Sequence, residues 1–148
     1  MLGMSRGSLR KCVDEARVEE AIRQAEGVTS GEIRVSVARF FWGDVEKAAS
    51  KVFHRLGMEQ TADRNSVLIF LVPSRKRFAI LGDTGIHAKV GQDFWNDASA
   101  CLSSQFHKGA YTEGLVEVIQ MVGDRLATHF PSAGAKDRNE LSDGVDFH

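Results

Sequence analysis

The stretch Ser66-Val67-Leu68-Ile69-Phe70-Leu71-Val72 decides the fold of this chain. Its six consecutive apolar residues include β-branched and aromatic side chains, which is typical of a strand buried on both faces. The run is far shorter than the roughly 20 apolar residues that a membrane-spanning helix needs. The sequence therefore predicts a central strand that is covered by helices on both sides.

Two further strands are predicted around this one. A turn at 73–76 and a returning segment at 77–81 predict an antiparallel hairpin. Residues 32–38 alternate between apolar and polar side chains, which predicts a strand. A helical pattern separates this strand from 66–72, so the two strands should pair in parallel with a right-handed crossover.

The complete pattern predicts an α/β fold with the element order helix-strand-helix-strand-strand-helix-helix. Such a chain forms a three-layer α/β/α sandwich around a small mixed sheet. Residues 82–91 are predicted to be a loop with a short helical turn. The 148 residues suit one domain over 11–131, with flexible polar ends over 1–10 and 132–148. Helices are predicted over 13–27, 45–56, 94–106 and 111–126.

Charge and cysteine content exclude several classes of function. A net charge of −1 argues against a nucleic-acid binder and against a polybasic membrane-surface protein. The first ten residues lack the apolar core of a signal peptide, which predicts a cytoplasmic protein without a membrane anchor. Cys12 and Cys101 form no metal-binding spacing. Cys101 is predicted to pack as a small apolar residue, with a catalytic thiol as the alternative.

Polar residues that are distant in sequence should meet at one edge of the predicted sheet. Glu32 begins the first strand, and Asp63 and Asn65 precede the second. Asp83 follows the third strand, which runs back to the same edge. Carboxylate and amide oxygens on glycine-containing loops suit a hard cation such as Ca²⁺ or Mg²⁺. We therefore predict a metal site from Glu32, Asp63, Asn65 and Asp83.

A purely structural interpretation of these residues stays open beside the metal site. Asp63 and Asn65 are good caps for a turn before a strand. Asp83 can open an Asx turn, and Glu32 can pair with Arg64. In that interpretation the polar residues shape loops and bind nothing.

The opposite edge of the sheet carries an aromatic loop, Phe40-Phe41-Trp42. Three adjacent aromatic side chains cannot all face one core, so an exposed contact patch for a protein partner is predicted. The alternative is that two of them pack inward and cap the sheet. The basic turn 75–77, with Arg39, is either a solvated tip or a site for an acidic partner.

Four stretches of the sequence resemble the TPM-domain family, which is sometimes described as phosphatase-like. The resemblance implies an α/β sandwich with a small central sheet, a divalent cation with calcium as the best candidate, and weak acid phosphatase activity in some members. Two departures stand out: Ser66 replaces a common Gly, and His87 lies near a position that is often acidic. The stretches are Thr29–Val35, Arg64–Phe70, Gly82–Ile86 and the aromatic-x-x-Gly-x-aromatic-x-x-Gly element in Phe106–Leu115, within a resemblance that covers 13–131.

Two functions are consistent with this sequence. The first is a non-catalytic module that binds a cation at the sheet edge and acts in protein interaction or quality control. The alternative is a metal-assisted acid phosphatase, whose catalytic candidates are Asp83, His87 and Arg64. There the metal would polarise a phosphoryl oxygen, Arg64 would hold the phosphate and His87 would protonate the leaving group. The sequence contains no phosphate-binding loop, HExxH motif or nucleophile motif, so it leaves enzymatic activity open.

Overall fold

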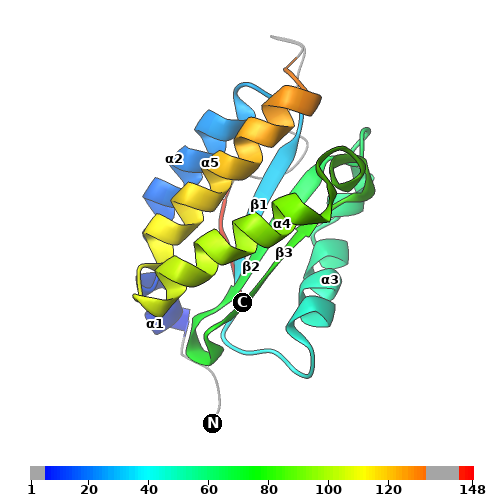
Figure 1. Ribbon diagram of the computed structural model, residues 1–148. Helices are drawn as coiled ribbons and strands as arrows, with labels where there is room; N and C mark the ends of the chain where they lie inside the picture. The colour runs from blue at the N-terminus through cyan, green and yellow to red at the C-terminus, as the bar shows by residue number, and fades with distance from the viewer. Residues whose placement is uncertain (1–5, 133–143) are drawn as a thin grey trace.

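A four-stranded mixed sheet lies between two layers of helices (Figure 1). The computed structural model describes residues 6–132 and 144–148. It confirms the predicted three-layer α/β/α sandwich. The strands are β1 (Glu32–Val37), β2 (Ser66–Val72), β3 (Arg77–Gly82) and β4 (Asp146–Phe147). The helices are α1 (Arg6–Lys11), α2 (Glu15–Glu26), α3 (Val45–Arg55), α4 (Thr84–His107) and α5 (Tyr111–His129), with 3₁₀ turns η1 (Met58–Gln60) and η2 (Pro73–Arg75).

The strands lie in the order β3-β2-β1-β4. β1 pairs in parallel with β2, and Glu32 stands opposite Ser66. β3 returns antiparallel to β2, with Val67 opposite Gly82. The predicted parallel pair and hairpin are both confirmed. This register brings the start of β1, the start of β2 and the end of β3 to one edge of the sheet.

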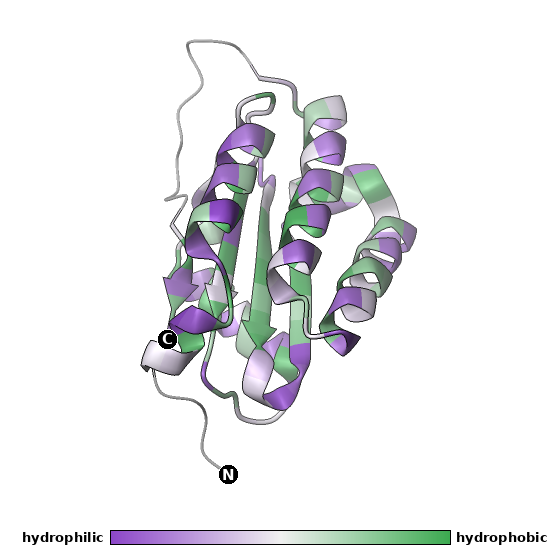
Figure 2. Ribbon diagram, turned by 90° about the vertical axis from the view of Figure 1, so that its left-hand side faces the viewer, coloured by the Kyte–Doolittle hydropathy of each residue, from purple (hydrophilic) through white to green (hydrophobic). Residues whose placement is uncertain are grey.

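The central strand separates two apolar layers, as its sequence predicts. All seven residues of β2 are buried. Val67, Ile69 and Leu71 pack with residues of α2, α4 and α5, whereas the intervening side chains pack toward α3. Figure 2 shows apolar strands at the centre of the molecule and helices that mix polar and apolar residues around them. Burying each large apolar side chain stabilises the fold by about 1.5–3 kcal/mol.

Helix α4 begins ten residues earlier than the sequence predicts, so the predicted loop over 82–91 is wrong. The Asp83 carboxylate accepts a hydrogen bond from the Thr84 amide at 2.8 Å and caps the first turn. The helical pattern was hidden by Gly91, whose φ of 76° and ψ of 174° break the helix into two parts. The rim of the sheet is thereby followed directly by a helix.

Both ends of the described chain contribute elements that the sequence did not predict. In α1, Leu9 is fully buried against the core. β4 pairs with the outer edge of β1, and the Arg39 amide donates to the His148 carbonyl at 2.8 Å. The prediction of flexible ends is therefore corrected for 6–10 and 144–148, while 1–5 and 133–143 lie outside the described residues. Covering the edge of β1 satisfies backbone groups that an open edge would leave exposed.

A polar network anchors β4 to the sheet. Asp146 Oδ2 accepts hydrogen bonds from Ser36 Oγ and Arg55 Nη2, both at 2.8 Å, and lies 2.9 Å from His148 Nδ1. Burial by itself raises the pKa of Asp146. The hydrogen bonds from His148, Arg55 and Ser36 outweigh that effect and hold the pKa well below its ordinary value.

The Asp146→Asn variant should be less stable than the parent by about 1–3 kcal/mol near pH 7. A carboxyl whose pKa is depressed in the folded state stabilises above its unfolded pKa, about 3.9, and this contribution is lost as pH falls through and below that value. The difference between parent and variant should therefore shrink on acidification. Urea unfolding at neutral pH and near pH 3 measures it, with Asp93→Asn on α4 as an exposed control. A difference that is the same at both pH values would contradict the role of this carboxylate.

Candidate functional site

One edge of the sheet concentrates the buried polar side chains of the molecule. Six of the seven buried polar residues in the described part of the chain lie there, and we call them the polar rim. Backbone hydrogen bonds tie its segments together: the Glu32 amide donates to the Asn65 carbonyl at 3.4 Å, and the Asp83 amide donates to the Ser66 carbonyl at 2.9 Å. The rim comprises Thr29, Glu32, Thr61, Asn65, Ser66 and Asp83.

Asn65 and Glu32 are the most enclosed large polar residues of the rim, each 1% exposed. The Asn65 side-chain amide donates to Ser30 Oγ at 3.3 Å. Its Oδ1 atom is buried and accepts no hydrogen bond from the described residues. An unsatisfied buried acceptor costs about 1–3 kcal/mol, so such an atom calls for a ligand, a donor or a cation.

Asp83 is held by a cation of the protein itself. Arg64 donates from Nε to Asp83 Oδ2 at 2.6 Å and from Nη2 to Oδ1 at 2.9 Å, which is a bidentate pair. The hydrogen bond and the charge of Asp83 raise the pKa of Arg64. The Asp83 side chain is nearly buried, whereas about half of the Arg64 side chain is exposed. Arg64 thus covers the carboxylate from the solvent side.

The remaining predicted metal ligand, Asp63, has an exposed side chain beside the rim. Glu59 of η1, which the sequence analysis missed, contributes a carboxylate instead. Its Oε2 atom is buried without a hydrogen-bond partner among the described residues, and its Oε1 lies 3.3 Å from His54 Nδ1. Hydrogen bonds from its own backbone and from His54 lower the pKa of Glu59; burial and, to a smaller extent, the charge of Asp83 oppose them.

The rim joins two carboxylates and an amide oxygen rather than a dense cluster of acids. Within residues 6–132 and 144–148, no group of three His, Cys, Asp or Glu side chains is arranged to hold a metal ion. A site here would thus depend on Asn65 Oδ1, backbone carbonyls or water for its remaining ligands.

Two glycines allow the segments of the rim to approach one another closely. A Cβ atom on Gly85 would lie 2.6 Å from the Arg64 carbonyl oxygen and closer still to that of Asp63. A Cβ atom on Gly82 would lie 2.5 Å from Cη2 of the Trp95 ring. The segment 82–85 therefore packs directly against the backbone of residues 63 and 64 and against the Trp95 ring.

The pattern that defines the TPM domain matches residues 11–125, most of the folded part. The chain belongs to the TPM-domain family. Five of the six polar-rim residues, all but Thr61, lie in three of the four stretches that carry the resemblance in sequence. A comparison with curated proteins gives no match.

Two solved structures are similar to this TPM domain. The BA42 protein of the psychrophilic bacterium Bizionia argentinensis is 37% identical, with a TM-score of 0.84 over 94% of both chains. The N-terminal domain of the cg2496 protein of Corynebacterium glutamicum is 16% identical, with a TM-score of 0.61 over 82% of this chain and 74% of that one. The second likeness shows a shared fold only. None of the helices in the described ranges is long and apolar enough to cross a bilayer, and a cytoplasmic location stays a prediction.

The residues proposed for phosphatase chemistry have other partners in this TPM domain. His87 lies in the first turns of α4, where its Nδ1 lies 3.0 Å from Trp95 Nε1, which donates to it. Arg64, proposed to hold the phosphate, directs two nitrogens at Asp83. Both catalytic candidates are therefore engaged by another side chain of the protein, His87 by Trp95 and Arg64 by Asp83.

Cys101 faces an acid that disfavours its reactive form. Its Sγ atom donates to Glu117 Oε2 at 3.1 Å, across α4 and α5. Burial, followed by the hydrogen bond and charge of Glu117, raises the pKa of Cys101 from 9.0 to about 11. A thiol of this kind is a poor nucleophile at neutral pH.

We expect Cys101 to react with iodoacetamide roughly 100-fold more slowly than an ordinary thiol at pH 8. The reason is that the raised pKa of Cys101 lowers the fraction of its reactive thiolate about 100-fold at this pH. Glu117→Gln should speed the reaction several-fold by removing the negative charge. Mass spectrometry of the tryptic peptides separates Cys101 from Cys12. Equal rates in the parent and Glu117→Gln would show that Glu117 has no such effect.

The aromatic loop lies at the edge of the sheet opposite the rim, between β1 and α3. Trp42 is 78% exposed and Phe40 is 38% exposed. Phe41 is partly buried against the apolar layer under α3, and Arg75 lies over its ring. One aromatic side chain therefore packs inward and two face outward.

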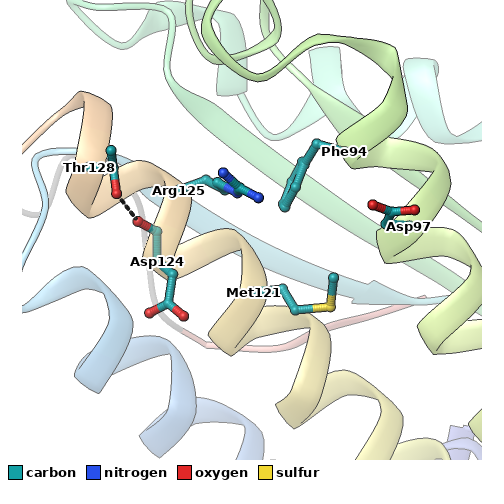
Figure 3. A pocket seen from close by; sticks show the side chains of 6 residues that line it. All are labelled: Phe94, Asp97, Met121, Asp124, Arg125 and Thr128. Carbon is teal, nitrogen blue, oxygen red and sulfur yellow. Dashed lines mark hydrogen bonds between the residues drawn. The ribbon is translucent and has the colours of Figure 1, made fainter.

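A surface pocket of about 280 Å³ lies between α4 and α5, and the sequence analysis did not predict it (Figure 3). Arg125 reaches across it toward Phe94, with 5.4 Å between the guanidinium carbon and the ring centroid. The pocket combines residues from two helices that face each other only in the folded chain. It is lined by Phe94, Asp97, Met121, Asp124, Arg125 and Thr128.

Proposed function

We propose that this TPM domain is a non-catalytic binding module that takes a divalent cation, Ca²⁺ rather than Mg²⁺, at the polar rim. The observation that carries the proposal is Asn65 Oδ1, a buried acceptor that finds no donor in the part of the chain that the structure describes. Glu32 and Asp83 offer carboxylates at the same edge, and Glu59 lies close enough to feel the charge of Asp83. Ca²⁺ accepts roughly six to eight oxygen ligands in variable geometry, so water completes such a site easily.

Arg64 is the group that the cation has to displace. Its guanidinium neutralises Asp83 in the absence of metal. Because half of the arginine side chain is exposed, it can move into solvent when a cation arrives. Because the Asp83 side chain is nearly buried, leaving it without a cation would cost about 3–5 kcal/mol, and the bound ion replaces the charge that Arg64 withdraws. Arg64 would then set the affinity of the rim without contacting the ion.

Calorimetric titration with Ca²⁺ tests the proposal on five proteins. The parent should bind, Asn65→Leu and Asp83→Asn should bind at least about tenfold more weakly, and Arg64→Gln should bind several-fold more tightly. Asp93→Asn, which alters an exposed carboxylate on α4, is the matched control. Thermal unfolding without metal confirms that each variant is folded. The proposal fails if the parent takes up no Ca²⁺, or if the control loses as much affinity as Asp83→Asn.

The metal-assisted phosphatase is the alternative function, and the rim favours it less. Arg64 and His87 are both engaged by other side chains. Hydrolysis of an aryl phosphate by the parent and by an Asp63→Asn/Asp83→Asn double variant distinguishes the two functions. A rate that the double variant abolishes would support the enzyme, whereas equal rates would indicate a contaminant. A cytoplasmic role in assembly or quality control is part of the binding-module proposal.

A further inference from the structure

We propose that the end of the molecule opposite the polar rim docks on the surface of an anionic lipid bilayer. Two neighbouring loops form this end: the segment that follows β1 and the turn between β2 and β3 (Figure 1, lower end). Ser74 Oγ donates to the Arg39 carbonyl at 2.7 Å and joins the two loops. We call this surface the aromatic-basic tip; it consists of Arg39, Phe40, Trp42, Arg75, Lys76 and Arg77.

The aromatic part of the tip exposes apolar surface to solvent. Phe40 and Trp42 are both exposed, and their rings meet edge to face with centroids 5.7 Å apart. Gly43 follows with a φ of 70°, so the loop makes a left-handed turn there, and no other atom lies near the position of its missing side chain. Tryptophan prefers the boundary between lipid headgroups and acyl chains, where its ring is buried and its N–H stays hydrated.

The cations of the tip are not neutralised by the protein. No ion pair joins Arg39, Arg75, Lys76 or Arg77 to any acid of the described chain. The Nε atom of Arg39 is buried without a hydrogen-bond partner there. Arg75 lies over Phe41, 5.8 Å from the ring centroid, which places one charge close to the aromatic loop. Such cations around exposed aromatic side chains suit the phosphates of a membrane surface.

Two acids that follow the aromatic loop in sequence offset only part of this charge. Asp44 caps α3, where its carboxylate accepts from the Glu46 amide at 2.7 Å and keeps its negative charge, so it offsets one of the four tip cations. Lys47, on the next residue, offsets Glu46. The net charge of −1 belongs to the whole chain, whereas a bilayer senses charges within about 8 Å at physiological salt. The carboxylates of the rim lie at the far edge of the sheet, so the molecule would approach lipid with its basic end first.

The shape of the tip favours a bilayer over an acidic protein segment. The loop after β1 and the turn between β2 and β3 project at the end of the sheet (Figure 1), and Phe40 and Trp42 on the first of them are exposed. A projecting aromatic loop with flanking cations can enter a headgroup layer without a preformed partner surface. An acidic protein partner would instead need a matching cavity for Trp42.

Trp42 itself reports the binding, because Trp95, the other tryptophan, is buried. Vesicles of phosphatidylcholine with about one-third phosphatidylglycerol should co-sediment with the protein and shift Trp42 emission to the blue, whereas pure phosphatidylcholine should do neither. EDTA in the buffer keeps the cation proposal separate. Arg75→Gln/Lys76→Gln should weaken binding roughly tenfold or more, because each cation near the membrane surface contributes about a fivefold factor. Trp42→Ser should weaken binding to a similar extent, because it removes the ring that enters the headgroup layer.

The paired variant Lys89→Gln/Arg125→Gln removes two exposed cations from the helical layer and is the matched control. It should bind anionic vesicles as the parent does. Absence of binding to anionic vesicles, or equal losses in the control and the tip variants, would overturn the proposal. A blue shift with a polyglutamate peptide but not with vesicles would also overturn it, and would assign the tip to an acidic protein partner.

Discussion

Gly85→Ala should destabilise the domain by about 3 kcal/mol, because the added methyl group collides with backbone rather than with a movable side chain. The new Cβ would come within 2.6 Å of the Arg64 carbonyl oxygen and closer to that of Asp63. The Gly85 amide also donates to the Arg64 carbonyl at 2.8 Å, so the two loops cannot separate without losing that bond. Denaturant unfolding measures the change.

Gly27→Ala is the matched control for this prediction. Gly27 has right-handed helical φ and ψ, and its added Cβ would lie at an ordinary 3.4 Å from the Arg23 carbonyl oxygen. Its stability should stay within about 1 kcal/mol of the parent. Equal stabilities for Gly85→Ala and Gly27→Ala would contradict the close approach of the two rim loops.

Gly82→Ala should cost about 2–3 kcal/mol for a different reason, a collision with the Trp95 ring. Trp95 is nearly buried on α4, and its Nε1 donates to His87, so the ring cannot turn away freely. A smaller side chain at position 95 would make room. Trp95→Leu by itself should be destabilising, because it removes packing and this hydrogen bond.

A double-mutant cycle separates these contributions. The Gly82→Ala/Trp95→Leu protein should be more stable than the sum of the single changes predicts, by about 1 kcal/mol or more. The same cycle with Phe53→Leu should be additive, since Phe53 belongs to the other apolar layer and not to the one that contains Trp95. Additivity at Trp95 would show that its ring is not the obstacle.

The fold could be predicted where side-chain periodicity is strong. The apolar run of β2 follows directly from burial on two faces, and the alternation in β1 places its apolar side chains on one face, although polar residues on its other face are buried too. Side-chain periodicity does not predict elements that are very short or that are interrupted by a break in the backbone. β4 has two residues and depends on Ser36 and Arg55, far away in sequence. The start of α4 was hidden because Gly91 breaks the helical pattern.

The location of the candidate site could also be predicted, because strand direction alone brings Glu32, Asn65 and Asp83 to one edge. Its electrostatics could not. The pairing of Arg64 with Asp83 depends on the backbone of Arg64 itself, which adopts a left-handed conformation (φ 51°) in the turn before β2. Glu59 lies on a 3₁₀ turn that no periodic pattern marks. A sequence shows which polar residues share an edge, but their pairing needs the positions of the side chains.

The most direct test of the cation site is a crystal of the protein soaked with Ca²⁺ or with Tb³⁺, whose anomalous scattering locates it without ambiguity. The proposal predicts a peak at the polar rim, with Asn65 Oδ1 and the Glu32 and Asp83 carboxylates as ligands and Arg64 turned toward solvent. A rim without a peak, with Arg64 still bound to Asp83, would contradict it.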